Sequence, residues 1–189
     1  MPALAAAATE RTPSIPWTSI LRGIKMDGTT EGKLDRLLVE NLGFLVEQLT
    51  WKDGYSDEDA RAAVEEYRKF VALSIVSEDP TFRAQYLGGV TPGLGMPSKH
   101  VDQVWHRHIL FTREYPEFCA RVNGEMIHHE PCTKESVSSM TSDETERIYN
   151  VLFGQMPTLW FEREDFLLAS TSHCRGGEGS CRACKRAAA

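Results

Sequence analysis

The residues best suited to chemistry lie in one short apolar run, Val101 to Leu110, which holds an aspartate, a tryptophan and two histidines. At about 100° per residue, Asp102 and His106 fall together on one flank of a helix, four residues apart. A carboxylate and an imidazole at this spacing project in parallel and can share one divalent transition metal ion, which could be zinc, iron, manganese or copper. The alternative is that Asp102 only orients His106 through a charge-assisted hydrogen bond and so stabilises the fold.

Further ligand candidates follow in the pair His128 and His129. Neighbouring residues of an extended chain point to opposite sides, so only one of these two histidines should face a small site. The other reading of each histidine is an imidazole in a polar turn at the surface. The pair therefore predicts one additional metal ligand.

His108 falls on the apolar face of the same helix, beside Val104 and Trp105. A buried imidazole needs a partner, because an unpaired buried polar group costs about 1–3 kcal/mol. His108 is a candidate second metal ligand or general base, or else a core histidine bonded to Tyr115 or to backbone. In an enzyme, either His108 or Tyr115 would be the proton-handling neighbour of the metal. Cys119 is a candidate thiolate ligand or, alternatively, a small buried hydrophobic residue.

This part of the chain contains one distinctive set of residues: Asp102-x-x-Trp105-His106-x-His108, then Tyr115, Cys119, Gly124 and His129 shortly before Pro131. The set resembles the motif of the glycine-rich domain-containing protein-like family of plants, fungi and bacteria. The resemblance covers about residues 60–135. It implies a helical domain associated with stress responses in plants and often followed by a Gly-rich or Gly/Cys-rich tail. It also implies that His129, rather than His128, is the third ligand.

Size and charge restrict the class of protein. A chain of 189 residues is long enough for one domain with a single core. The net charge of −6 and the lack of a basic stripe argue against nucleic-acid binding. The longest apolar run, around Phe70 to Val76, is far shorter than the roughly 20 residues that span a bilayer. We expect a soluble protein whose partner is a small molecule or another protein.

The cysteine count and the chain start bear on location. Five cysteines, an odd number, fit free thiols in a reducing compartment better than a disulfide framework. The start has neither the positive region nor the apolar stretch of a secretory signal. We therefore expect a cytoplasmic protein, with an organellar transit segment as the alternative. Four residues near the C-terminus could bind a soft metal ion: His173, Cys174, Cys181 and Cys184. In the absence of metal, the tail that contains them is expected to be disordered.

The apolar spacing predicts an all-α or mainly α single domain over residues 29–168. A disordered lead-in over residues 1–28 and a flexible Cys/Gly-containing tail over residues 169–189 are expected on either side. The expected helices span about residues 31–52, 57–75, 98–113, 116–122 and 141–153, the first two as a hairpin. Residues 157–168 are a strand or a helical turn.

A long Gly/Pro loop is expected over residues 79–97, without a regular element. Because it leads directly into the motif helix, we expect it to border the metal site. Its glycines have neither the spacing nor the preceding strand of a nucleotide-binding loop.

These patterns predict a transition-metal-binding protein. If it is an enzyme, an open coordination position would activate water or oxygen. The alternative is a non-catalytic scaffold in which the aspartate, histidines, tryptophan and cysteine form a buried polar network.

Overall fold

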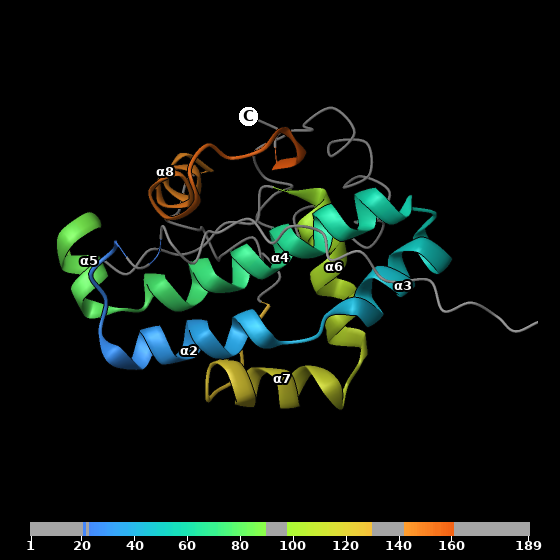
Figure 1. Ribbon diagram of the computed structural model, residues 1–189, viewed down its shortest axis with the longest axis horizontal. Coiled ribbons are helices and arrows are strands. Elements are labelled where there is room, and N and C mark those ends of the chain that lie inside the picture. Colours follow the sequence, from blue (N-terminus) through green and yellow to red (C-terminus); the bar gives the residue numbers. More distant parts are fainter. Residues whose placement is uncertain (1–20, 22, 90–97, 130–141, 161–189) are drawn as a thin grey trace, which may run out of the picture.

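The computed structural model describes residues 21, 23–89, 98–129 and 142–160. Within these ranges every regular element is helical, which confirms the predicted fold class (Figure 1). The elements are α2 (Gly28–Val39), α3 (Gly43–Asp53), α4 (Asp57–Ser77), α5 (Pro80–Tyr86), α6 (Lys99–Leu110), α7 (Glu114–Val122), α8 (Ser142–Phe153) and a 3-10 turn, η1 (Thr158–Trp160). None of the helices among the described residues has both the length and the apolar composition that a membrane span requires.

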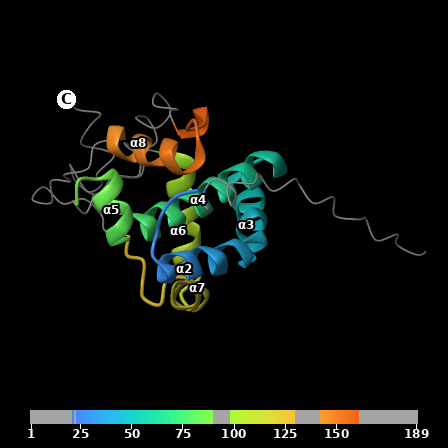
Figure 2. The same cartoon turned by 60° about the vertical axis from the view of Figure 1, so that its left-hand side comes forward.

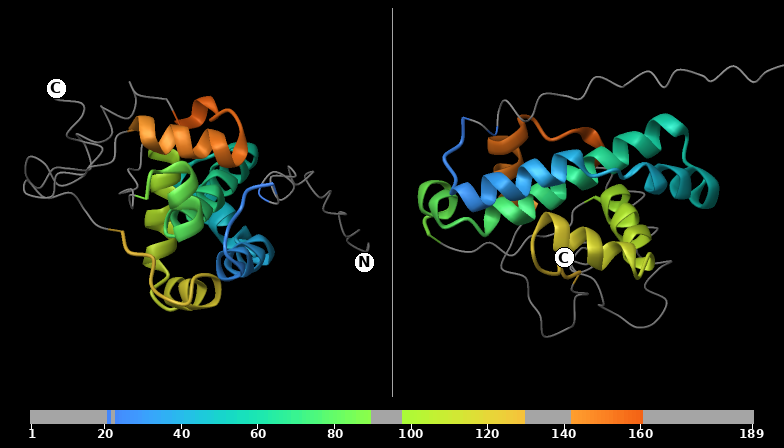
Figure 3. Two further views of the ribbon diagram at one scale, coloured as in Figure 1. Left: turned by 90° about the vertical axis from the view of Figure 1, so that its left-hand side faces the viewer. Right: turned by 60° about the horizontal axis from the view of Figure 1, so that its bottom comes forward.

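The 21-residue helix α4 is the centre of the fold. Its N-terminus is capped by Ser56, whose side chain accepts the N–H of Asp59 at 3.1 Å, and acidic residues of the first turn complement the helix dipole. Figure 1 shows α4 between α8 and α2, with α7 beyond α2, and Figure 2 shows α6 crossing α4. The right-hand view of Figure 3 shows α2 and α4 side by side. Most of the core therefore packs around α4.

A polar cluster is buried where α8 and η1 meet α4. Glu66 and Lys69 form an ion pair with an Nζ–Oε1 distance of 2.6 Å, and their side chains are only 9% and 8% exposed. Oε2 of Glu66 accepts the Tyr149 hydroxyl at 2.6 Å and the indole N–H of Trp160 at 2.7 Å. Because both oxygens of the carboxylate are satisfied, the pair is tolerated in the interior. The apolar spacing gave no indication of this cluster.

The prediction of one continuous helix from about residue 31 to residue 52 is wrong. The chain leaves α2 at Glu40, whose backbone is extended, and α3 begins at Gly43, whose N–H bonds to the side chain of Asn41 at 3.0 Å. Arg68 of α4 donates to the carbonyls of Leu37 and Glu40, at 2.5 and 3.0 Å. The break is therefore stabilised by a guanidinium from another helix, which satisfies carbonyls that a continuing helix would have bonded itself.

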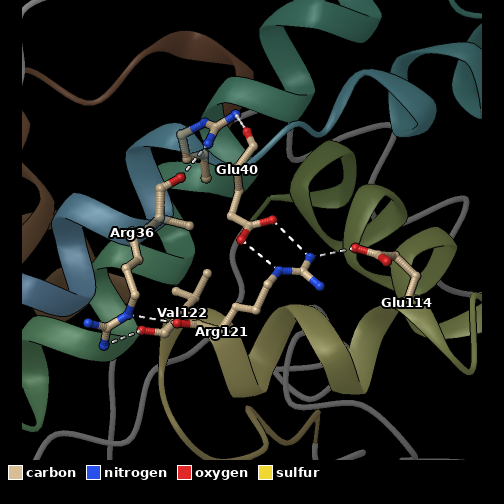
Figure 4. A network of polar contacts seen from close by, with 7 residues as sticks. Arg36, Glu40, Glu114, Arg121 and Val122 are labelled. Atoms are coloured by element: carbon tan, nitrogen blue, oxygen red, sulfur yellow. Dashed lines mark hydrogen bonds and ion pairs between the residues drawn. The ribbon is translucent and has the colours of Figure 1, made fainter.

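Arginines also join α7 to α2 (Figure 4). Arg36 donates to the carbonyls of Arg121 and Val122 at the end of α7, at 2.7 and 3.3 Å. Arg121 in turn forms two hydrogen bonds of 2.9 Å with Glu40 and one of 2.8 Å with Glu114. This network fixes the position of α7, from which the chain continues to His129.

The expectation that residues 79–97 contain no regular element is wrong for their first part, because α5 lies there. The Asp79 carboxylate accepts the N–H of Phe82 at 2.7 Å, and Pro80 takes the first helical position, where its missing N–H is harmless. Phe82 is fully buried and attaches α5 to the core. The part of the expected loop over residues 90–97, including its placement beside the motif helix, lies outside the described residues.

The junction between α6 and α7 comes earlier than predicted. Helix α6 ends at Leu110 rather than Arg113, and α7 begins at Glu114, so Pro116 is its third residue rather than its first. A proline is tolerated there because the N–H groups of a first turn have no partner within the helix. The predicted end of α7 is confirmed, since Gly124 has a φ of +85°, which glycine adopts readily.

The two ends of the described chain bear on the remaining expectations. Leu21 and Ile24 are buried, although they lie in the predicted lead-in. Helix α8 agrees with the expected last helix, and residues 158–160 adopt a helical turn rather than a strand. Several expected features lie outside the described residues: the cap at Thr141, residues 161–168, and the tail with His173, Cys174, Cys181 and Cys184.

Candidate metal centre

Helix α6 presents its candidate ligands on the flank away from the core. Its N-terminus is capped by Ser98, whose hydroxyl accepts the N–H of Val101 at 3.3 Å. Two contacts fix α6 against the end of α3 and the turn that follows it. Arg107 donates to the carboxylate of Asp53, with an Nε–Oδ2 distance of 2.8 Å, and the Tyr55 hydroxyl lies 2.7 Å from Nδ1 of His100. The core face consists of Val101, Val104, Trp105 and His108.

The structure brings Asp102, His106 and His129 together. Oδ2 of Asp102 lies 3.1 Å from Nδ1 of His106, and Oδ1 lies 3.1 Å from Nε2 of His129. Donor atoms of all three side chains lie within 4.8 Å of one another, and no other group of three such ligands occurs among the described residues. The side chains of His106, Asp102 and His129 are 55%, 23% and 16% exposed, so the cluster opens to solvent on the side of His106.

This donor set fits a transition metal. Two imidazole nitrogens and one carboxylate oxygen suit zinc, iron, manganese or copper. Each imidazole nitrogen lies 3.1 Å from a different oxygen of Asp102, so both rings already stand beside the carboxylate that would hold the ion. The rings of His106 and His129 have centroids 4.6 Å apart, and one donor atom from each of the three side chains lies within 4.8 Å of the other two. Three protein ligands leave at least one coordination position open.

Electrostatics keep the central carboxylate charged. Burial alone would raise the pKa of Asp102, but hydrogen bonds from His106 and His129 outweigh it and hold this pKa below its ordinary value. The hydrogen bond to Asp102 raises the pKa of His106 above 6.5, against the opposing effect of burial. A metal ion at this site therefore competes with the proton of His106 at a higher pH than it would at an ordinary histidine.

A second group of contacts lies behind His129. The indole N–H of Trp105 donates to the Tyr115 hydroxyl at 2.8 Å, and this hydroxyl donates to the carbonyl of Ile127. The ring of Trp105 also meets the ring of His129 edge to face, with centroids 4.5 Å apart. Tyr115 thus contacts Trp105 and Ile127 rather than any of the three clustered ligands. Burial raises the pKa of Tyr115, so its hydroxyl keeps its proton.

The structure does not bring His108 to the cluster. His108 is fully buried, about 120° around the helix from Asp102, and its Nδ1 lies 2.9 Å from the Tyr67 hydroxyl. Burial lowers the pKa of His108 to about 4, so the ring is neutral at neutral pH. The geometry is that of the core-histidine alternative, with Tyr67 as the partner in place of Tyr115 or backbone. Four aromatic rings surround it, those of Phe44, Tyr67, Tyr115 and Phe118.

Cys119 and His128 also lie apart from the three clustered ligands. Cys119 is a free thiol that is only 1% exposed, and burial raises its pKa, which disfavours the thiolate a metal would need. Its polar contacts are with the Tyr115 side chain and the backbone of Ile127, so its position is that of a small buried residue outside the cluster. His128 is exposed while His129 faces Asp102, as the alternation of an extended chain predicts.

Two positioning groups were missed from the sequence. The apolar spacing of its helix places Tyr67 on the buried face but does not identify it as the partner of His108. The carbonyl of Ile127 cannot be identified as the acceptor for Tyr115, because every residue has a backbone carbonyl. Both act over long separations, 41 residues from Tyr67 to His108 and 12 from Tyr115 to Ile127. The one general indication of either contact is that the hydroxyl of a buried tyrosine is usually hydrogen-bonded, which predicts a partner without identifying it.

Comparison with known proteins extends this description. The family model described as UCP032817-like matches residues 43–152, which is more than half of the chain. The chain belongs to the UCP032817-like family. The part of the chain matched by the UCP032817-like model begins at the first residue of α3, ends within α8 and contains all three clustered ligands. No curated protein and no solved structure matches the chain.

Proposed function

We propose that this protein binds a divalent transition metal ion through Asp102, His106 and His129. The observation that carries the proposal is the convergence of these side chains from two separate segments, with both oxygens of one carboxylate facing imidazole nitrogens at 3.1 Å. Zinc, iron, manganese and copper all accept this donor set.

As an enzyme, the protein would act on a small molecule that reaches the metal from the exposed side, next to His106. The metal would supply Lewis acidity, which lowers the pKa of a bound water or polarises a bound oxygen atom. The negative charge of Asp102 would hold the ion, and the Trp105 ring would close the inner side of the site. His108 is buried away from this opening, so it would not act as a general base in the reaction.

Elemental analysis of protein purified without a histidine tag tests this proposal. We expect close to one metal ion per chain in the wild type and almost none in His106→Ala, because loss of a direct ligand is severe. His128→Ala is the matched control, since His128 is the neighbouring exposed imidazole, and its metal content should equal that of the wild type. Equal metal content in His106→Ala and wild type would refute the assignment.

The competing function is a non-catalytic scaffold. It is favoured by the fact that both oxygens of Asp102 have partners without any ion, so the cluster can also tie the segment after α7 to α6. Under this function, repeated preparations contain no metal, and His129→Ala lowers the melting temperature of the protein without changing any metal content.

Two further parts of the proposal concern kinship and location. We propose kinship with the glycine-rich domain-containing protein-like family, supported by the types and spacing of Asp102, Trp105, His106, His108, Tyr115 and Cys119. We also propose a reducing compartment such as the cytoplasm, supported by Cys119, which is buried as a free thiol.

A further inference from the structure

The hydroxyl of Tyr115 connects two segments that form opposite sides of the candidate centre. It accepts the indole N–H of Trp105 on α6, and it donates its own proton to the carbonyl of Ile127 in the segment after α7. The side chain is 5% exposed, so water does not compete effectively for these bonds. A buried hydroxyl with both a donor and an acceptor satisfied is well suited to hold two pieces of backbone at a fixed distance.

The position of Ile127 makes this contact specific to one ligand. Ile127 precedes His129 by two residues, so in an extended chain the two residues have the same orientation, opposite to that of His128. Fixing the Ile127 carbonyl therefore determines that His129, and not His128, faces Asp102. A slip of one residue would direct the wrong histidine toward the carboxylate.

Trp105 supports the same arrangement from the other side. Its indole N–H bonds to Tyr115, and the edge-to-face contact of its ring with His129 limits rotation of the imidazole. The direct partners of His129 are thus Asp102, Trp105 and the ring of His106, while Tyr115 acts one contact further out. Contacts of this outer kind commonly tune metal sites by orienting the ligands.

We infer that Tyr115 is a positioning residue for His129, which it aligns as a metal ligand by holding the carbonyl of Ile127 and the indole of Trp105. This inference rests on the proposed function for its metal-binding consequence. The alignment of His129 itself is a property of the metal-free protein and is testable there.

The metal-binding test uses Tyr115→Phe, which removes only the hydroxyl. With zinc as the probe, we expect the dissociation constant to rise by about 10- to 100-fold. In a His129→Ala background the same substitution should have no further effect, because the ligand through which Tyr115 acts is already gone. Tyr67→Phe is the control, since it removes another buried hydroxyl bonded to α6, and it should leave zinc affinity unchanged.

The metal-free test measures how fast diethyl pyrocarbonate modifies each histidine, by peptide mass spectrometry. His129 is 16% exposed, so we expect its modification to be several-fold faster in Tyr115→Phe than in wild type, with little change at the exposed His106. Equal rates at His129 in both proteins would overturn the inference. If the wild type bound no zinc, the proposed function would fail, and the modification rates would still decide whether Tyr115 aligns His129.

Discussion

The hydroxyl of Tyr67 lies 2.9 Å from Nδ1 of His108 in a pocket lined by aromatic rings. Burial holds the pKa of Tyr67 well above 10, so the hydroxyl carries its proton. If Tyr67 donates its proton to Nδ1 of His108, one buried polar atom of these two side chains lacks a partner among the described residues. That atom is Nε2 of His108. The opposite tautomer would leave the hydroxyl proton unsatisfied as well. We therefore infer that Tyr67 is the donor and that Nε2 carries the imidazole proton.

Tyr67→Phe should lower the free energy of unfolding by about 1–3 kcal/mol, because it leaves Nδ1 of His108 buried without a donor. Urea denaturation followed by circular dichroism measures the change. Tyr86→Phe is a suitable comparison, since the Tyr86 hydroxyl bonds only to the exposed side chain of Gln85 among the described residues, and it should cost far less. Equal losses in the two variants would contradict the buried donor role of Tyr67.

His108 should make the protein less stable as the pH falls below 6.5. Its pKa is about 4 in the folded protein against 6.5 when unfolded, so between these values only the unfolded chain takes up the proton. The full difference corresponds to about 3 kcal/mol, and roughly 2 kcal/mol of it should be lost between about pH 7 and pH 5.

The reference for this pH effect is the double variant Tyr67→Phe/His108→Phe. This variant retains Asp102 and His106, whose pKa values are also shifted, so their contributions to the pH dependence of stability cancel in the difference from wild type. Urea denaturation at both pH values gives the comparison. A wild type that loses no more stability than the double variant would show that the His108 ring is not buried in its neutral form.

Lys69→Met should destabilise the protein by about 3–5 kcal/mol, because it leaves the Glu66 carboxylate buried without its counter-charge. Adding Glu66→Gln should recover much of this loss, since the remaining amide can still accept from Tyr149 and Trp160. Thermal and urea denaturation of the single and double variants decide the matter. Additive losses would mean that the two charges do not interact in the folded protein.

Zinc affinity should fall as the pH is lowered from about 8 to 6. The pKa of His106 is raised by Asp102, so the metal competes with a proton at a higher pH than it would for an ordinary histidine. Each displaced proton contributes about a tenfold loss of affinity per pH unit below that pKa. Calorimetric titration measures this slope, with His128→Ala expected to share it. A flat profile would exclude an imidazole with a raised pKa from the ligand set.

Local features of the sequence were sufficient where one helix determines the geometry. Helices α4 and α6 begin close to their predicted starts, with Ser56 and Ser98 as their caps, because capping depends on residues three positions apart. Asp102 and His106 meet as predicted, because a helix fixes the relation between residues four apart. The alternation of an extended chain predicted that only one of His128 and His129 faces the site, and the family resemblance implied that it is His129.

Contacts between distant segments account for what the sequence could not predict. The break after α2 depends on Arg68, and the partner of His108 is Tyr67, so both involve a residue of α4 that apolar spacing alone identifies only as helical. Helix α5 is a different case. Asp79 and Pro80 are a local start signal for a helix, whereas the Gly/Pro content of residues 79–97 predicted a loop. Gly88 and Gly89, which have positive φ, follow the helix and only end it.

The arginines that join α2, α4 and α7 have a consequence for how the protein opens. The last carbonyls of α2 are bonded by Arg68 of α4, and those of α7 by Arg36 of α2, so each helix end is completed by a neighbouring helix. Helices completed in this way do not fray one at a time; their amide protons should exchange with solvent together, as one cooperative unit. The chain to His129 leaves from α7, so the contact of His129 with Asp102 should last only as long as that unit stays closed.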